Sequence, residues 1–416
     1  MAMPSNGALD STLALFADPY GFIRKRCLRL GSDVFQTRLL MRPTLCMSGA
    51  DAAQLFYDAS RFQRAGAAPE PLRATLFGKR SVQTLDDAPH WSRKALFVQV
   101  LSADRVDALA RAVRTEWDRK LASWPADCEM PLYATTQEVL SRAVCVWAGV
   151  PLAEQEVAER SAWLVALYDD AARGPLAHLH SRRSRTQAEA WLCTQLERVR
   201  AGLDRHAAGS VLEAVALHRD TQGHLLPLQV AAVELLNLLR PTVAVSVFVM
   251  FVAHALHFQT GIRAKLLGGD PGYRVRFLDE VRRYYPFFPA VAAKVREDFT
   301  WRGLPFHQGR RVLLDLYGTN HDPRIWTRPE EFEPDRFLSR QPTPYEFIPQ
   351  GGASVATGHR CPGEGVAMAV MDECLDFLLY RAHCGAVPPD PRIDMRRLPA
   401  LPRAVLTVSA RLGADV

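Results

Sequence analysis

The stretch Gly358-His359-Arg360-Cys361-Pro362-Gly363-Glu364 decides the fold of this chain, and Phe347-Ile348-Pro349-Gln350-Gly351-Gly352 precedes it. Apolar residues recur at helical spacing directly afterwards, at Val366, Val370, Cys374 and Leu378. Cys361 therefore lies in a glycine-bracketed loop that opens a helix, where unpaired N–H groups and the helix dipole favour a thiolate. A thiolate in such a loop is suited to bind haem iron axially. The loop alone is equally compatible with a small buried structural cysteine.

Other motifs lie upstream of this loop in a definite order. Glu280-Val281-Arg282-Arg283 places Glu280 and Arg283 on one helix face, which by itself would indicate an ordinary surface ion pair. A strand-like stretch over 299–315 follows, and then a Pro-Glu-Glu-Phe segment that includes Arg336. Together with the cysteine loop, this order resembles the cytochrome P-450 superfamily. The resemblance implies that Glu280 and Arg283 bind Arg336 and support the thiolate side of a haem.

The same resemblance implies a mainly α protein with the cytochrome P-450 fold and haem b (heme b) as cofactor. We expect a single domain over residues 1–416, with a triangular helix-rich part over about 90–285 and 345–385. A smaller β-rich lobe is expected over about 30–75 and 290–320. The haem would lie between a long central helix and the cysteine loop. No proline- or glycine-rich linker divides the chain, and 48% hydrophobic residues suffice for a core that encloses a cofactor.

Charge and cysteine content limit the possible partners. A net charge of +6 over 416 residues is mild, so no nucleic-acid partner is expected, and the basic run Arg182-Arg183-Ser184-Arg185 is interpreted as a solvated helix face. Eight cysteines without a Cys-x-x-Cys pair argue against a disulfide framework or zinc site and predict a cytoplasmic protein. The N-terminus lacks signal-peptide features. The apolar stretch over 241–253 is shorter than a span of about 20 residues, so no membrane anchor is expected.

A long helix is predicted from about residue 227 to 258, with apolar residues around most of its circumference. Arg240 is the only charged residue between Leu238 and Val252, and Pro241 follows it. A buried, unpaired charge and a proline inside a helix are both costly. Arg240 either pairs with an internal acid such as Glu234, or reaches the helix edge, or awaits a ligand carboxylate that its guanidinium binds bidentately.

The resemblance favours the ligand carboxylate. Most cytochromes P-450 carry an acid–threonine pair where this chain has Arg240-Pro241, and the arginine–proline pattern is typical of the fatty-acid peroxygenase branch. The long separation of Phe347 from Cys361 also looks like that branch. It implies a haem-thiolate peroxygenase that hydroxylates long-chain fatty acids at the α (C2) and/or β (C3) carbon with hydrogen peroxide. No redox partner is then required, and the substrate carboxylate held by Arg240 acts as general acid and base.

Further site residues follow from the same branch. Gln83 matches a position over the haem where histidine accompanies decarboxylation and glutamine hydroxylation, so hydroxylation with at most minor decarboxylation is expected; it is alternatively a polar loop residue. The candidate walls of an acyl-chain pocket, which are alternatively core residues, are Phe77, Phe287 and Phe288. The candidate partners of the haem propionates are Arg64, His90, Arg93, Lys94 and His359.

Three other functions remain open from sequence. A reductase-driven fatty-acid P-450 monooxygenase would require a ferredoxin or flavoprotein partner. A non-catalytic haem-binding fatty-acid carrier or sensor would bind the acid without product. A hydroperoxide-rearranging haem enzyme, which shares the longer cysteine loop, would consume fatty-acid hydroperoxide without added oxidant.

Overall fold

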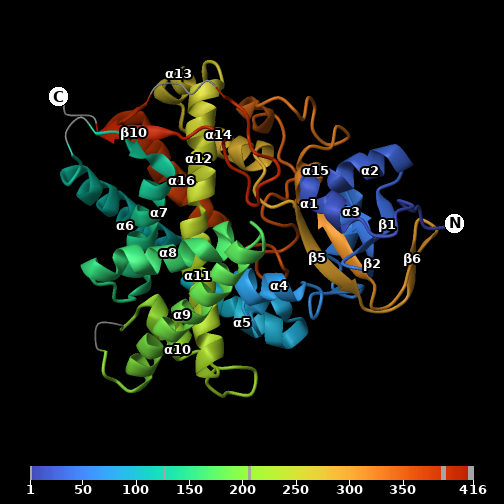
Figure 1. The fold of residues 1–416 in the computed structure, drawn as a ribbon, viewed down its shortest axis with the longest axis horizontal. Coiled ribbons are helices and arrows are strands. Elements are labelled where there is room, and N and C mark those ends of the chain that lie inside the picture. The colour runs from blue at the N-terminus through green and yellow to red at the C-terminus, as the bar shows by residue number, and fades with distance from the viewer. Residues whose placement is uncertain (1, 126–127, 205–207, 386–389, 411–416) are drawn as a thin grey trace.

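The computed structural model describes residues 2–125, 128–204, 208–385 and 390–410. Helices make up one large part of the molecule, and a smaller β-rich lobe lies beside it, next to the N-terminus (Figure 1). This arrangement confirms the predicted mainly α fold. The strands of the lobe fall within the two expected regions, 30–75 and 290–320.

The principal sheet of the β-rich lobe has five strands in the order β1-β2-β8-β5-β3. Their bounds are β1 (Val34–Leu39), β2 (Arg42–Met47), β3 (Phe62–Gln63), β5 (Ala290–Val295) and β8 (Arg311–Asp315). Strands β2 and β8 pair in parallel, and the other neighbours pair antiparallel. A two-residue turn joins β1 to β2, and both turn residues, Leu40 and Met41, have positive φ, as a tight hairpin turn requires.

The remaining elements are short strands and the helices of the larger part. Those N-terminal to the central helix are α1 (Thr12–Ala17), α2 (Phe22–Leu30), α3 (Ala50–Phe56), α4 (Glu70–Leu72), α5 (Asp87–Val100), α6 (Ala103–Ala122), β4 (Met130–Pro131), α7 (Leu132–Ala148), α8 (Val157–Asp169), α9 (Pro175–Arg200) and α10 (Val211–Ala216). Those C-terminal to it are α13 (Ile262–Leu267), α14 (Pro271–Tyr284), β6 (Phe299–Trp301), β7 (Leu304–Phe306), α15 (Leu316–Asn320), α16 (Glu364–Asp376), β9 (Ala382–Cys384) and β10 (Thr407–Ala410).

The long central helix consists of two segments, α11 (Leu228–Ala244) and α12 (Ser246–Phe258), separated at Val245. Pro241 lies inside α11, four residues before this interruption, and has no N–H to donate to the carbonyl of Asn237. The Val245 N–H bonds the carbonyl of Thr242, three residues back, instead of the usual fourth residue. The sequence predicted one helix over about 227–258. The structure has helix over nearly the same residues, but divides it into two segments at Val245.

The central helix is also the one described helix that is long and apolar enough, by length and composition, to cross a membrane. It covers 31 residues, Leu228–Phe258, and 94% of its most apolar window is buried inside the protein. The apolar run over 241–253 is only part of this helix, which also contains Glu234 and Arg240. Burial by α7, α8, α9 and α16 identifies this segment as a core helix.

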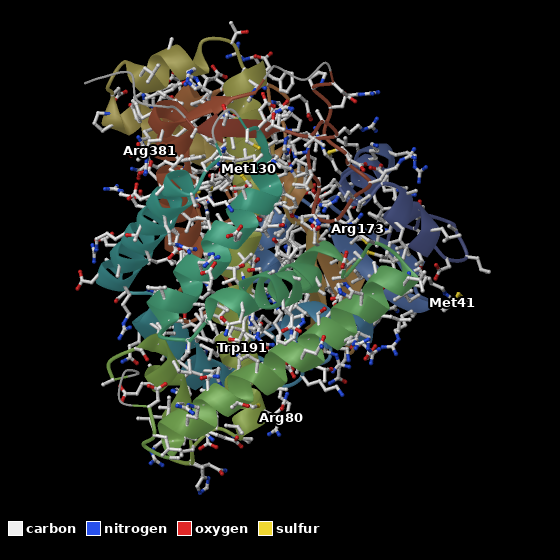
Figure 2. All side chains as sticks on the ribbon, turned by 60° about the vertical axis from the view of Figure 1, so that its left-hand side comes forward. Met41, Arg80, Met130, Arg173, Trp191 and Arg381 are labelled. Carbon is white, nitrogen blue, oxygen red and sulfur yellow. The ribbon has the colours of Figure 1, made fainter. Side chains whose placement is uncertain are left out.

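The interpretation of the run Arg182-Arg183-Ser184-Arg185 in α9 as a solvated face is wrong for two of its four residues. Arg182 and Arg183 are exposed, but Ser184 and Arg185 are buried, and only 4% of Arg185 is accessible to solvent. Four consecutive residues of a helix are spread over about 300° of its circumference, so a basic run of this length includes inward and outward positions. Figure 2 shows α9, labelled at Trp191, as a long helix lying along the surface of the helical part.

Candidate active site

The cysteine loop has the geometry expected of a ligand loop. Helix α16 begins at Glu364, with Gly363 as its N-cap, so Cys361 lies just before the helix. The N–H of Cys361 donates to the carbonyl of Gln350 at 3.1 Å, and the Gln350 amide nitrogen lies 3.9 Å from the Cys361 sulfur. Burial raises the pKa of the Cys361 thiol, whereas the Gly363 N–H and the Lys94 ammonium favour the thiolate.

Glu280 and Arg283 form a fully buried bidentate ion pair, in which Nε and Nη2 of Arg283 lie 2.7 and 2.8 Å from the two carboxylate oxygens of Glu280. Nε of Arg336 donates to the same carboxylate at 3.1 Å, and the backbone N–H of Glu333 does so at 2.7 Å. Arg283 also donates to the carbonyl groups of Asn320, Pro329 and Glu331. The three side chains that the sequence predicted to contact one another do so, and they tie α14 to the segment between α15 and α16.

Four predicted propionate partners gather near the loop. The rings of His90 and His359 stack at 4.0 Å between centroids, and His359 lies 3.6 Å from the Asp86 carboxylate. Burial lowers the pKa of His90 to about 3 and that of His359 to about 4, so both imidazoles are neutral N–H donors at neutral pH. Arg64 is 8% exposed, and both it and Lys94 affect His90 electrostatically.

Lys94 and Arg64 supply the positive charge of this cluster. The Lys94 ammonium donates to the carbonyl of Arg360, next to Cys361, and burial lowers the pKa of Lys94 to about 8. The Arg64 guanidinium lies over the Phe56 ring at 4.3 Å, and burial lowers its pKa to about 10. Arg93 is not part of this cluster, because its guanidinium turns away to bind Glu234.

Arg240 is buried, with 6% of its surface exposed, and its Nε has no hydrogen-bond partner among the described residues. Burial, with a further contribution from the Arg185 charge, lowers its pKa to about 9. Cys361 and Tyr168 act in the opposite direction, and no carboxylate is among the groups that stabilise its charge. The proposed internal partner, Glu234, is already engaged by Arg93 at 2.6 Å.

Glu234 instead organises the loop that carries Gln83. It accepts the backbone N–H of Val82 at 2.8 Å and the Asn237 side-chain amide at 3.2 Å, and that amide lies 3.4 Å from the Gln83 side-chain oxygen. Asn237 was not among the predicted site residues, and its buried Oδ1 has no partner within the described part of the chain. Its signal was spacing: Glu234, Asn237 and Arg240 follow at three-residue intervals on an otherwise apolar helix.

The three candidate acyl-chain residues differ in position. Phe77 ends a π-helical turn, η1 (Arg73–Phe77), and is partly buried against the main core. Phe287 packs on Phe248 of α12 at 4.4 Å between centroids. Phe288 contacts Phe287 edge-on at 4.9 Å but is 37% exposed. Phe77 and Phe287 are thus partly buried against the main core, whereas Phe288 is exposed.

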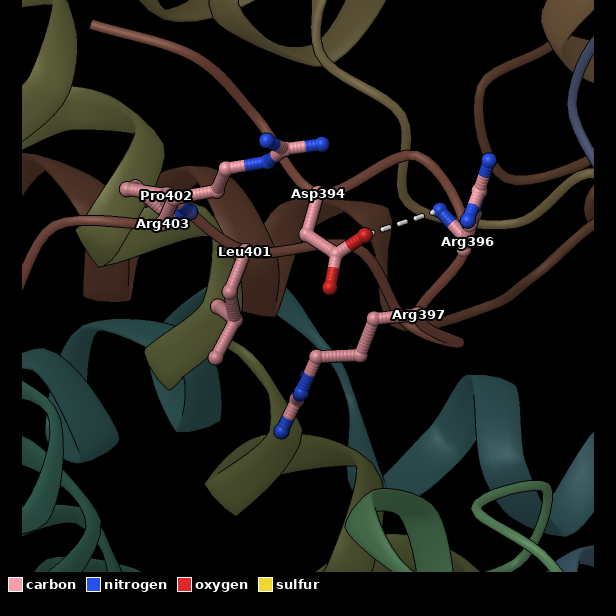
Figure 3. Close-up of a pocket in the computed structure, with 6 residues that line it drawn as sticks. All are labelled: Asp394, Arg396, Arg397, Leu401, Pro402 and Arg403. Carbon is pink, nitrogen blue, oxygen red and sulfur yellow. Dashed lines mark hydrogen bonds between the residues drawn. The ribbon is translucent and has the colours of Figure 1, made fainter. Parts of the chain in front are cut away.

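A cavity of about 500 Å³ lies elsewhere, in the segment between β9 and β10 (Figure 3). Its lining residues are Asp394, Arg396, Arg397, Leu401, Pro402 and Arg403. Arg397 is bound to Asp169 and to the carbonyl of Pro399, and Asp394 accepts the Arg396 N–H at 3.1 Å. None of the residues predicted for the site lines this cavity, so it is not the predicted site.

The residues around Cys361 and Arg240 fit a haem. A free sulfur precedes a helix, and two buried cations and two neutral imidazoles lie near the loop. Arg240, whose Nε has no partner among the described residues, is close enough to Cys361 to be affected by its charge. Thiolate, cations and N–H donors are the groups that the iron and the propionates of haem require.

Comparison with known proteins agrees with this geometry. The cytochrome P450 family profile matches residues 273–389. Among curated proteins, cytochrome P450 4A10 of Rattus norvegicus is 32% identical over 139 residues, which cover 32% of this chain and 25% of that protein. Cytochrome P450 137 of Mycobacterium tuberculosis is 29% identical over 143 residues, covering 34% and 29%. This chain thus spans less than a third of the length of these curated relatives.

Solved structures match nearly the whole chain. Cytochrome P450SP alpha (CYP152B1), in complex with (R)-ibuprophen, is 45% identical, with a TM-score of 0.94 over 97% of this chain and 98% of that one. Cytochrome P450EX alpha (CYP152N1), with myristic acid, is 39% identical, with a TM-score of 0.93 over 98% of each chain. Cytochrome P450 OleT, ligand-free, is 29% identical, with a TM-score of 0.94 over 99% of this chain and 100% of that one. The chain belongs to the cytochrome P450 family.

Proposed function

We propose that this protein is a peroxygenase that hydroxylates long-chain fatty acids at C2 and/or C3 with hydrogen peroxide. The observation that carries the proposal is the buried Arg240 guanidinium, for which the described chain supplies no carboxylate. A fatty-acid carboxylate would form an ion pair with the Arg240 guanidinium. The structure of cytochrome P450EX alpha with myristic acid, 39% identical to this chain, supports a fatty acid as the ligand.

In this proposal Cys361 would bind the haem iron through its thiolate, and the haem would supply the oxidising chemistry when peroxide is the oxidant. Arg64, His90, Lys94 and His359 would hold the propionates. The overall reaction consumes one C–H bond and one peroxide and yields one hydroxyl group and one water.

Arg240 binds both oxygens of the substrate carboxylate through its planar guanidinium and thereby fixes the acid head group. Because C2 and C3 are the carbons nearest that head group, fixing it restricts reaction to them. Pro241 stands where most family members carry a threonine, so Arg240-Pro241 has no protein acid or hydroxyl to move protons. The pinned carboxylate can accept a proton from one peroxide oxygen and return it to the other. Gln83 lines the same side, and Phe77 and Phe287 lie along the acyl chain.

The charges around α16 support a route without a redox protein. Three acids of α16 are paired with arginines of the same chain: Glu373 with Arg114 at 2.8 Å, Asp376 with Arg274 at 2.7 Å and Glu364 with Arg360 at 2.7 Å. An acidic electron donor would have to compete with these pairs. No disulfide joins two cysteines in the described part of the chain, which supports a cytoplasmic location.

The experiment is incubation of the haem-loaded protein with tetradecanoic acid and hydrogen peroxide, without reductase, followed by mass spectrometry of the products. The proposal predicts 2-hydroxy and 3-hydroxy acids. Product formation only with NAD(P)H and a reductase would establish a monooxygenase. A fatty-acid-induced change in haem absorption without any product would establish a carrier or sensor. Turnover of fatty-acid hydroperoxide without oxidant would establish a rearranging enzyme.

A further inference from the structure

Arg185 is a buried cation that the proposed mechanism does not use. It lies on α9 with 5% of its side chain exposed, and its one carboxylate partner is Glu189, one turn further along, at 2.6 Å. Its other two donors reach across to a different segment. Nη1 bonds the carbonyl of Thr75 at 2.7 Å, and Nη2 bonds the carbonyl of Phe77 at 3.3 Å.

The two carbonyl groups belong to the π-helical turn η1, which ends at Phe77. The last carbonyl groups of a helix have no donor within the helix, so they require partners from elsewhere. The turn closes through the Gly78 N–H, which bonds the carbonyl of Arg73 at 3.0 Å. Turns of this kind are uncommon and often lie at functional sites. Arg185 therefore donates to carbonyl groups at the end of this turn, which includes Phe77.

The arginine head is packed closely against the end of this turn. Gly78 has φ +87°, and a Cβ built on it would lie 2.1 Å from Nη2 of Arg185 and 2.7 Å from Cγ1 of Val233 on α11. Only a residue without a side chain leaves room for the guanidinium here. The turn is consequently held between α9 and α11, with the Arg185 guanidinium filling the space.

We propose that Arg185 is a positioning residue that sets the place of the acyl chain by clamping the carbonyl groups of Thr75 and Phe77. The inference rests on the proposed function in that Phe77 is taken as a wall of the acyl-chain pocket. The clamp holds the backbone of Phe77 and Gly78, which limits where the ring can lie. The position of that wall decides whether C2 or C3 is presented for oxidation, since small displacements change the reacting geometry strongly.

Arg185→Lys separates geometry from charge. Lysine retains the positive charge beside Glu189, but a single ammonium cannot reproduce the fixed fork that reaches two carbonyl groups. Arg200→Lys is the matched control. Arg200 lies on the same helix, about 22 Å along its axis from Arg185, and bonds the carbonyl groups of Ala216 and Leu226 at 2.9 and 2.8 Å.

The first measurement needs no turnover. In the haem-loaded protein without fatty acid, hydrogen–deuterium exchange over residues 70–84 should become about fivefold faster in Arg185→Lys, because two hydrogen bonds to this turn are lost. Arg200→Lys should leave exchange of these residues unchanged. Unchanged exchange in Arg185→Lys, or an equal increase in Arg200→Lys, would overturn the clamp.

The second measurement is the ratio of 2-hydroxy to 3-hydroxy product from tetradecanoic acid and peroxide. Arg185→Lys should move this ratio toward unity by about threefold, and Gly78→Ala, which displaces the guanidinium, should move it in the same direction. Arg200→Lys should keep the parent ratio. Faster exchange with an unchanged ratio would overturn the positioning role.

A parent protein that forms no product with peroxide would overturn the proposed function and not the clamp. The fatty-acid-induced change in haem absorption then tests the positioning role. The dissociation constant of tetradecanoic acid should rise by about threefold in Arg185→Lys and remain unchanged in Arg200→Lys. Equal affinity in all three proteins would overturn it.

Discussion

Nη1 of Arg93 lies 2.6 Å from Oε1 of Glu234, so the one acid of α11 is engaged by a residue of α5. Glu234 precedes Arg240 by six residues and is the acid of α11. Its carboxylate is neutralised from α5 and anchors the Val82 N–H. Arg240 is therefore left with a buried charge that the described chain does not compensate, which is the property that the proposed substrate binding uses.

The partner of Glu234 can be tested with two double-mutant cycles. Glu234→Gln combined with Arg93→Gln should show a coupling free energy of about 2 kcal/mol or more in unfolding measurements, because each single change strands a buried charge. Glu234→Gln combined with Arg240→Gln should show coupling below about 0.5 kcal/mol. The reverse pattern would make Glu234 the partner of Arg240 and remove the vacancy for a ligand carboxylate.

Arg240→Ala should lower kcat/KM for peroxide-driven fatty-acid oxidation by about a hundredfold or more, since a charged, bidentate contact is lost. The haem content should remain that of the parent protein, and Arg240→Lys should retain part of the activity. In the parent protein, a short carboxylate such as acetate should support peroxide oxidation of a substrate without an acid group. If acetate had the same effect in Arg240→Ala, the carboxylate would not act through Arg240.

Cys361→Ala should abolish the absorption band of the reduced, CO-bound haem that gives the family its name, because the thiolate ligand is removed. Cys374→Ala is the control, as Cys374 is a fully buried thiol on the adjoining helix α16. This variant should retain the band. Persistence of the band in Cys361→Ala would assign the ligand to another residue.

Glu280→Gln should lower the free energy of unfolding by about 3–5 kcal/mol and reduce haem retention, because Arg283 and Arg336 lose their shared buried carboxylate. Asp51→Asn, which breaks an exposed ion pair with Arg302, should cost less than about 1 kcal/mol. Urea unfolding and the haem-to-protein ratio measure the two effects. Similar losses in both variants would contradict a special role for the buried network.

Asp315 should make stability depend on pH. Burial raises its pKa to about 7, above the ordinary value of 3.8, so the folded state binds its proton more tightly than the unfolded chain does. The resulting stabilisation is complete below about pH 4 and is lost as pH rises to about 7. Asp315→Asn cannot titrate. The free energy of unfolding of Asp315→Asn, relative to that of the parent, should increase by up to about 4 kcal/mol between about pH 4 and pH 7. If the free energies of unfolding of the two proteins changed in parallel with pH, the raised pKa of Asp315 would be contradicted.

The cysteine loop and the extent of the central helix could be predicted because each depends on local spacing, whereas the strand-rich regions were expected from the resemblance to the cytochrome P-450 superfamily. Glu280 and Arg283 are neighbours on one helix turn, and the Leu40-Met41 turn joins two adjacent strands. The break at Val245 was not predicted, although Pro241 was recognised, because a proline specifies a disturbance without specifying where the next helical segment begins.

The order and spacing of the motifs by themselves indicated the family, the mainly α fold and the candidate thiolate. These properties can be recognised from the order of residues along the chain, without knowing which residues meet in space. Tertiary structure alone decided which buried charges meet. In the folded protein Glu234 pairs with Arg93, and no carboxylate stabilises the charge of Arg240. Arg185 donates hydrogen bonds to the carbonyl groups of Thr75 and Phe77. The physical reason is that the cost of burying a charge depends on partners that are distant in sequence, and only the packing of α9 and α11 against α5 and the segment before it brings them together.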